Sequence, residues 1–335
     1  MDDLATDKPG PMGWGVDESR VDTEKRLAGE LEERSPGLLM RRAPKEPLDN
    51  ELIQKVRDGM AADGMTGGMH LRYIEPIVFG VFLIYLRQLI GSCVASTAFR
   101  LGVIRMLWES FALGDAEEIF GTKLIGTNNV APFAPYHYRS GRMLGGLNGG
   151  DGSFCSSQVE GLQKYGFLPC DTPGLVSDAF PEPQSTRTYR QMGNSNSFLE
   201  KFAPFGRKHL LNESEPVRDA ESAKTLVTEH FKPLAICSMW AFKPSHTHPT
   251  WKLADGTPVV IYQRDRSTSW AHSMSIVGIV EVDGDWFVIV LNSWGNAHRN
   301  GDWFVVPLET FAVWVRDADC RSYGDIEMTD NVLGA

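Results

Sequence analysis

Residues 271–295 read AHSMSIVGIVEVDGDWFVIVLNSWG. This stretch holds two runs rich in β-branched and aromatic residues, separated by Asp283 and Gly284. An Asp-Gly pair between two such runs is typical of a tight antiparallel hairpin. Because a hairpin folds its second strand back along the first, the pattern predicts that Asn292 lies beside His272.

A helix with a cysteine at its start is predicted further upstream. Residues 92–111, SCVASTAFRLGVIRMLWESF, place apolar residues at helical spacing, and Gly91 and Ser92 supply a turn and a cap. Cys93 would then stand at the amino end, where unpaired N–H groups and the helix dipole stabilise a thiolate. The turn also lets a reacting carbonyl approach the Cys93 N–H, which would form half of an oxyanion hole.

A nucleophilic thiol needs a base, and His272 has the most suggestive context of the eight histidines. It begins a strand-like apolar run, so a rigid scaffold would hold it, and an amide at Asn292 could fix its ring. Taken singly, each residue has a simpler interpretation. Cys93 would be a buried helix-start cysteine, His272 a satisfied core histidine and Asn292 a turn asparagine.

Together, the segments GSCVASTAF, AHSMSIVGI and LNSWGNAHRNGDWF resemble the papain family of cysteine peptidases, and they occur in the family's chain order. The resemblance implies a two-lobed α+β fold, with Cys93 on a helical lobe, His272 and Asn292 on an antiparallel β-barrel-like lobe, and the active-site cleft between them. It assigns Trp294 the shielding of the His272–Asn292 hydrogen bond. It requires no metal and no organic cofactor.

The resemblance extends over about residues 85–310. The segment NGGDGSFCSSQVEGLQKYGFLP is similar to the family's glycine-containing stretch that binds substrate backbone, followed by a helix ending in Tyr-Gly. Gly152 and Ser153 match that stretch, and a helix is expected over 156–165.

The oxyanion position departs from the family's pattern. The family places a glutamine six residues before the nucleophile, whereas Gln88 is five residues before Cys93 and Arg87 occupies position six. Losing one oxyanion donor costs about 100- to 1000-fold in turnover. The place of Gln88 therefore decides between a working enzyme and a weak or inactive one.

The five cysteines are an odd, widely spread set without a CxxC pair. Apart from Cys93, we interpret each as a small buried apolar residue (Cys155, Cys170, Cys237 and Cys320). Ile90 stands where secreted members of the family carry a disulfide cysteine, and Val94 where they carry tryptophan. The sequence thus resembles divergent bacterial or phage branches and predicts a reducing compartment.

Composition narrows the function further. The chain has 335 residues, is 42% hydrophobic and 23% charged, and carries a formal net charge of -10, which argues against a nucleic-acid partner. The apolar stretch 77–86 is too short to span a bilayer. No signal peptide is visible, so a cytoplasmic or virion-associated protein is expected.

The predicted organisation is an amino-terminal extension over 1–70, a peptidase domain over 71–325 and a tail over 326–335. The extension would hold helices near 22–34 and 48–60 and act as a pro-segment or as a docking arm for an assembly partner. Within the domain, the helical lobe covers about 85–180 and the β lobe about 221–318, and a surface loop or insertion over about 178–220 separates them. Strands are expected over 233–242, 257–263, 273–282, 286–292 and 303–307.

The predicted function is cleavage of a polypeptide substrate through a thioester acyl-enzyme. One rival is a papain-fold structural or binding protein, such as a phage virion component, with weak or no catalysis. Another is acyl transfer or deamidation by the same three residues. His246 and His248 are interpreted as part of a polar surface loop, because two histidines alone are weak evidence for a metal site.

Overall fold

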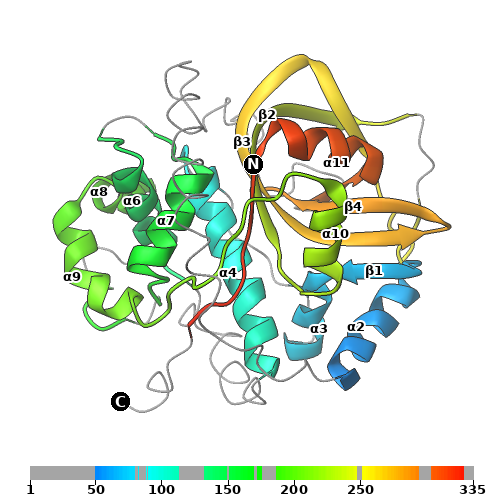
Figure 1. Ribbon diagram of the computed structural model, residues 1–335, viewed down its shortest axis with the longest axis horizontal. Coiled ribbons are helices and arrows are strands. Elements are labelled where there is room, and N and C mark those ends of the chain that lie inside the picture. Colours follow the sequence, from blue (N-terminus) through cyan, green and yellow to red (C-terminus); the bar gives the residue numbers. More distant parts are fainter. Residues whose placement is uncertain are drawn as a thin grey trace, which may run out of the picture.

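The fold joins a group of helices to a six-stranded antiparallel sheet, with helix α4 (Cys93–Ala112) between them (Figure 1). The computed structural model describes residues 50–79, 82, 88, 90–112, 132–148, 151–169, 172–175, 186–246, 251–293 and 303–327. The expected α+β class, with a helical lobe and an antiparallel sheet lobe, is confirmed.

The sheet lobe is built around the long strand β3 (Tyr262–Val282). The strands run in the order β5 (Trp303–Pro307), β4 (Asp285–Leu291), β3, β2 (Leu234–Pro244) and β6 (Asp319–Ser322), and β1 (Gly67–His70) also pairs with β3. The buried apolar side chains of these strands pack together with those of α4 in one large hydrophobic core.

The β3–β4 hairpin forms as the sequence predicts. Val282 pairs with Asp285, and the two residues between them, Asp283 and Gly284, have φ values of 53° and 88°. Positive φ at both central positions is the type I′ geometry, whose twist matches that of the flanking strands. The turn therefore fixes the register that returns the end of β4 to the middle of β3.

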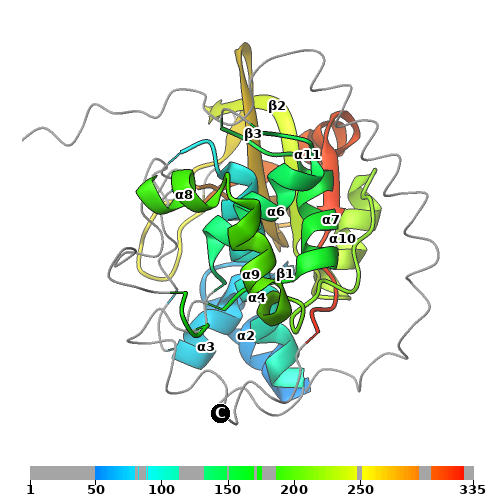
Figure 2. The same ribbon diagram turned by 90° about the vertical axis from the view of Figure 1, so that its left-hand side faces the viewer.

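The helical lobe gathers α6 (Ala134–Leu144), α7 (Cys155–Tyr165), α8 (Thr186–Met192) and α9 (Asn196–Gly206) on one side of α4, as both views show (Figures 1 and 2). It has a core of its own, formed by Phe133, Tyr136, Tyr165, Leu168, Leu175, Met192, Leu199, Phe202 and Ala203. The predicted surface loop over 178–220 is wrong in its described part, because α8 and α9 bury apolar side chains in this core. The expected helices over 92–111 and 156–165 correspond to α4 and α7.

The predicted boundary at residue 70 is also wrong. Helix α2 (Asn50–Ala62) buries Leu52, Val56 and Met60, and β1 pairs with β3 from Gly67↔Glu281 to His70↔Gly278. A short 3-10 helix, η2 (Leu71–Tyr73), and α3 (Ile74–Phe79) follow directly. The chain from Asn50 on is part of the folded domain, and the helix predicted near 22–34 lies outside the described residues.

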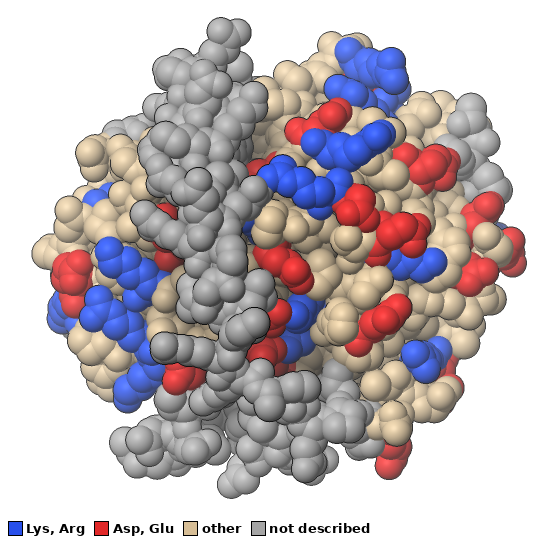
Figure 3. All heavy atoms as spheres, in the orientation of Figure 1, with Lys and Arg blue, Asp and Glu red and all other residues tan. Residues whose placement is uncertain are grey.

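The carboxyl-terminal part closes the sheet lobe. Helix α10 (Ala220–Thr228) leads into β2, and α11 (Leu308–Trp314) and η3 (Val315–Asp317) connect β5 to β6. Ile326 is buried and its N–H donates to Glu109 on α4 at 2.9 Å, so the domain extends past the predicted end at 325. On the face in Figure 3, acidic and basic side chains are intermixed. No helix in the described part of the chain has the length and apolar character needed to cross a membrane.

Candidate active site

The histidine and the asparagine singled out in the sequence meet at the end of the β3–β4 hairpin. His272 Nε2 lies 2.9 Å from Asn292 Oδ1, and both residues are buried. An amide oxygen only accepts hydrogen bonds, so the ring nitrogen facing it carries the hydrogen. In the neutral ring this leaves Nδ1 as the nitrogen that can take up a proton. The backbone N–H of Ser293 also donates to Asn292 Oδ1, at 2.6 Å, and holds the amide in place.

Cys93 is the first residue of α4, and its side chain is buried. Strand β3 packs along this helix. A hydrogen bond between the two elements joins neighbours of the candidate pair: Ser273 Oγ donates to Thr97 Oγ1 at 3.1 Å. Thr97 follows Cys93 by about one helical turn on the same face, a rise of about 6 Å. The nucleophile's helix and the histidine's strand are thus joined one turn below the thiol.

Gln88 belongs to the segment before Cys93 and connects it to Ser293, directly after Asn292. Its backbone N–H donates to the Ser293 carbonyl at 2.7 Å, and its Oε1 accepts from Ser293 Oγ at 2.7 Å. Its Nε2 donates to the Ile90 carbonyl at 2.6 Å. The structure therefore brings Gln88 next to Ser293 at the candidate site despite its shifted sequence position, with its amide engaged by the Ile90 carbonyl and the Ser293 hydroxyl.

Gly152 is held from within the helical lobe. It has a φ of 107°, its N–H donates to the Tyr138 hydroxyl at 3.1 Å, and its carbonyl accepts from Arg142 at 2.8 Å. Burial raises the pKa of the Tyr138 hydroxyl to about 12, and the negative charge of a nearby Cys93 thiolate adds to that rise. Both backbone polar groups of Gly152 are thus engaged within the helical lobe, and the neighbouring Ser153 is buried.

The interpretation of the cysteines needs a correction. Cys155 and Cys237, which the sequence predicts to be separate buried apolar residues, form a disulfide. Cys93 and Cys320 are not disulfide-bonded, and burial raises the pKa of the Cys320 thiol. Cys170 lies outside the described residues. The expectation of a reducing compartment rests on the absence of the family's disulfide framework at Ile90, whereas the Cys155–Cys237 disulfide favours an oxidising compartment.

The structure describes one of the three remaining predicted residues. His246 is exposed beyond the end of β2, while His248 and Trp294 lie outside the described residues. No group of three or more His, Cys, Asp or Glu side chains within the described ranges is arranged to hold a metal ion.

Sequence reasoning missed four residues around the candidate pair: Thr97, Cys155, Cys237 and Ser273. Ser273 and Cys155 stand next to segments that the motifs marked, which was the available signal. Their partners come from distant elements, and no spacing in the sequence points to them.

The sequence matches no protein-family model and no curated protein. The structure is similar to several solved cysteine proteases. Xylellain, a cysteine protease from Xylella fastidiosa, is 17% identical, with 72% of this chain and 82% of that chain covered and a TM-score of 0.49. Procathepsin B S9 from Trypanosoma congolense is 10% identical, with 85% and 82% covered and a TM-score of 0.47. Bromelain from Ananas comosus is 10% identical, with 72% and 93% covered and a TM-score of 0.40. At these identities nothing about activity follows from the likeness.

Proposed function

We propose that this chain is a cysteine-type peptidase in which Cys93 is the nucleophile, His272 its base and Asn292 the group that orients the histidine. The observation that carries the proposal is the 2.9 Å hydrogen bond between His272 and Asn292. His272 lies on β3, and this strand packs along α4, the helix that begins at Cys93. Nucleophilic catalysis needs these three groups: a nucleophile, a base beside it and a third group that orients the base.

The reaction follows from these roles. The Cys93 proton passes to His272 Nδ1, and the thiolate attacks the carbonyl carbon of a peptide bond, forming a C–S bond and an oxyanion. When the oxyanion collapses, the C–N bond breaks and His272 gives its proton to the leaving amine. A water then loses a proton to His272 and attacks the thioester, which releases the acid and regenerates the Cys93 thiol.

The oxyanion would be stabilised by the Cys93 N–H and by Gln88. The helix start supplies the first donor. The role of Gln88 is supported by the hydrogen bond that its Oε1 accepts from Ser293 Oγ, directly after Asn292. For Gln88 to serve as the second donor, its Nε2 must keep one hydrogen for the oxyanion besides the one it gives to Ile90.

A polypeptide is the proposed substrate, lying extended beside Ser153. Trp294 remains a proposed shield for the His272–Asn292 hydrogen bond. The same chemistry would also serve acyl transfer or deamidation.

The rival from another class is a papain-fold binding or structural protein without efficient catalysis, such as a virion component. Two observations favour it: the Gln88 amide already donates to Ile90, and the Cys93 side chain is completely buried. A partner that binds the amino-terminal segment is compatible with this proposal and with the peptidase proposal.

The test is the rate of Cys93 alkylation by iodoacetamide between pH 4 and 9, resolved by peptide mass spectrometry. An activated thiolate reacts well below the ordinary thiol pKa of about 8.5, and His272→Ala removes that reactivity. Cys320, whose thiol is held protonated, is the internal control and stays unlabelled in the folded protein. If Cys93 titrates as an ordinary thiol in both proteins, the peptidase proposal fails and the rival stands.

A further inference from the structure

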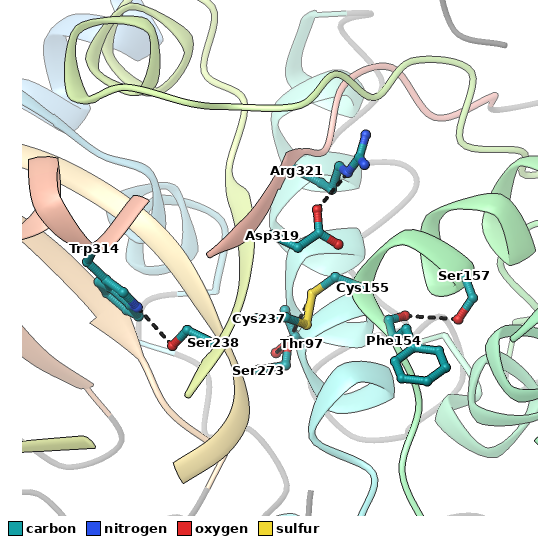
Figure 4. The surroundings of a disulfide bond; sticks show 10 residues. All are labelled: Thr97, Phe154, Cys155, Ser157, Cys237, Ser238, Ser273, Trp314, Asp319 and Arg321. Carbon is teal, nitrogen blue, oxygen red and sulfur yellow. Dashed lines mark hydrogen bonds and ion pairs between the residues drawn. A yellow bond between two sulfur atoms is a disulfide. The ribbon is translucent and has the colours of Figure 1, made fainter. Parts of the chain in front are cut away.

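The disulfide joins the two lobes. Cys155 is the first residue of α7 in the helical lobe, and Cys237 lies in β2 of the sheet lobe, 82 residues further along the chain. Both side chains are at most 2% exposed. Figure 4 shows the bond between the helix and the strand, with Thr97 and Ser273 beside Cys237. The bond therefore limits how far α7 and β2 can move apart.

The disulfide lies next to the candidate active site in the sheet register. In the β2–β3 pair, Cys237 stands opposite Ser273 and Ser238 stands opposite His272. On the other side of the bond, Cys155 Sγ lies 3.6 Å from Ser273 Oγ. One register position thus separates the cross-link from the proposed base.

Ser273 links the disulfide to the nucleophile's helix. Its hydroxyl contacts Cys155 Sγ and donates to Thr97 Oγ1 at 3.1 Å, and both Ser273 and Thr97 are fully buried. Helices α4 and α7 and strands β2 and β3 therefore converge on one buried serine, which directly follows His272.

We propose that the Cys155–Cys237 disulfide and the Ser273–Thr97 hydrogen bond form a lobe lock that sets His272 against Cys93, with Ser273 as a positioning residue. This inference rests on the proposed peptidase function. The two reacting side chains come from different elements, α4 and β3, so any sliding between these elements changes their separation. A misplacement of about 1 Å can cost about 100-fold in rate, which is why a tie one turn below the thiol matters.

A purely structural role for Ser273 is the alternative, and the chain offers a matched control for it. Ser275 lies two residues further on the same face of β3 and is equally buried, and its hydroxyl has no hydrogen-bond partner among the described residues. Ser275→Ala thus removes the same atom from the same strand without touching the lock.

The experiment measures site-resolved alkylation of Cys93 by iodoacetamide against pH, in Ser273→Ala, Thr97→Val, the double variant and Ser275→Ala. Circular dichroism first confirms that each is folded. Removing either hydroxyl should lower the rate constant at pH 6 by roughly five- to tenfold and move the thiolate titration upward. The double variant should lose no more than one single variant, because both remove the same bond. Ser275→Ala should stay within about twofold of wild type, by the usual effect of substitutions away from such contacts.

The disulfide is tested by Cys155→Ala/Cys237→Ala in the same assay, at a temperature where the variant is folded. A loss at pH 6 at least as large as that of Ser273→Ala supports the lock. An unchanged pH profile in Ser273→Ala, or an equal loss in Ser275→Ala, overturns it while the peptidase proposal stands. If the wild type itself shows no reactivity that depends on His272, the peptidase proposal fails, and the lock falls with it.

Discussion

Nε2 of His272 donates to Oδ1 of Asn292 across 2.9 Å, and this bond fixes which nitrogen of the ring is left to act as a base. The partners are 20 residues apart and lie at the two sides of a hairpin closed by a two-residue turn. The orientation of the proposed base therefore depends on one local element.

Asn292→Ala should lower kcat for peptide hydrolysis by about 10- to 150-fold, because a hydrogen bond to a group that becomes charged is worth about 1.5–3 kcal/mol. Asn292→Asp keeps an oxygen acceptor and should lose less. Steady-state kinetics on a peptide library gives the values. Equal losses in the two variants would contradict an orienting role for the Asn292 oxygen.

Gln88→Ala should lower kcat by about 100- to 1000-fold if its amide stabilises the oxyanion. Alkylation of Cys93 by iodoacetamide forms no oxyanion, so its rate should stay near that of the wild type. Measuring both rates on one preparation separates the two effects. A parallel fall in both would mean that Gln88 only holds the Ile90 and Ser293 segments in place.

Cys155→Ala/Cys237→Ala should lower the free energy of unfolding by about 2–5 kcal/mol, because the cross-link closes a long loop in the unfolded chain. Urea denaturation measures the loss. Cys320→Ala removes an equally buried sulfur without opening a cross-link and should cost less. Equal stability of the oxidised and reduced wild type would contradict a structural disulfide.

The burial of His137 should make the free energy of unfolding fall in acid. His137 is fully buried on α6, both its ring nitrogens lack hydrogen-bond partners among the described residues, and burial lowers its pKa to about 3. The unfolded chain takes up this proton near pH 6.5, so the stability is present above that pH and is lost as the pH falls toward 3.

Between pH 7 and pH 5, urea unfolding should therefore show that the wild type loses on the order of 2 kcal/mol more than His137→Leu. An identical pH dependence in His137→Leu and the wild type would show that His137 is not held neutral.

Amino-terminal processing, if it occurs, should stop before Asn50. Cleavage near residue 70 would remove α2 and β1 together with the buried side chains of Val56, Met60 and Met69, and would leave the β3 residues opposite β1 without their partner. Intact-mass analysis during incubation gives the boundary, and the Cys93→Ala variant shows whether the cleavage is its own. A stable, folded product beginning near residue 70 would contradict this prediction.

The local elements of this protein could be predicted from the sequence. It predicted the helix that starts at Cys93, the hairpin with its Asp-Gly turn, and the meeting of His272 with Asn292, because period, caps and turn residues act within about 20 positions. It also brought Gln88 into consideration, although its place beside Ser293 depends on a contact 205 residues away.

The contacts between distant elements could not be predicted from the sequence and are visible in the folded chain. The disulfide joins residues 82 apart, the Ser273–Thr97 hydrogen bond spans 176, and α8, α9 and β1 gain their burial from surfaces elsewhere in the chain. The periodicity of a sequence predicts which face of a helix or strand is buried, but it does not predict which other element packs against that face. An odd set of cysteines likewise leaves every pairing open until the fold brings two of them together.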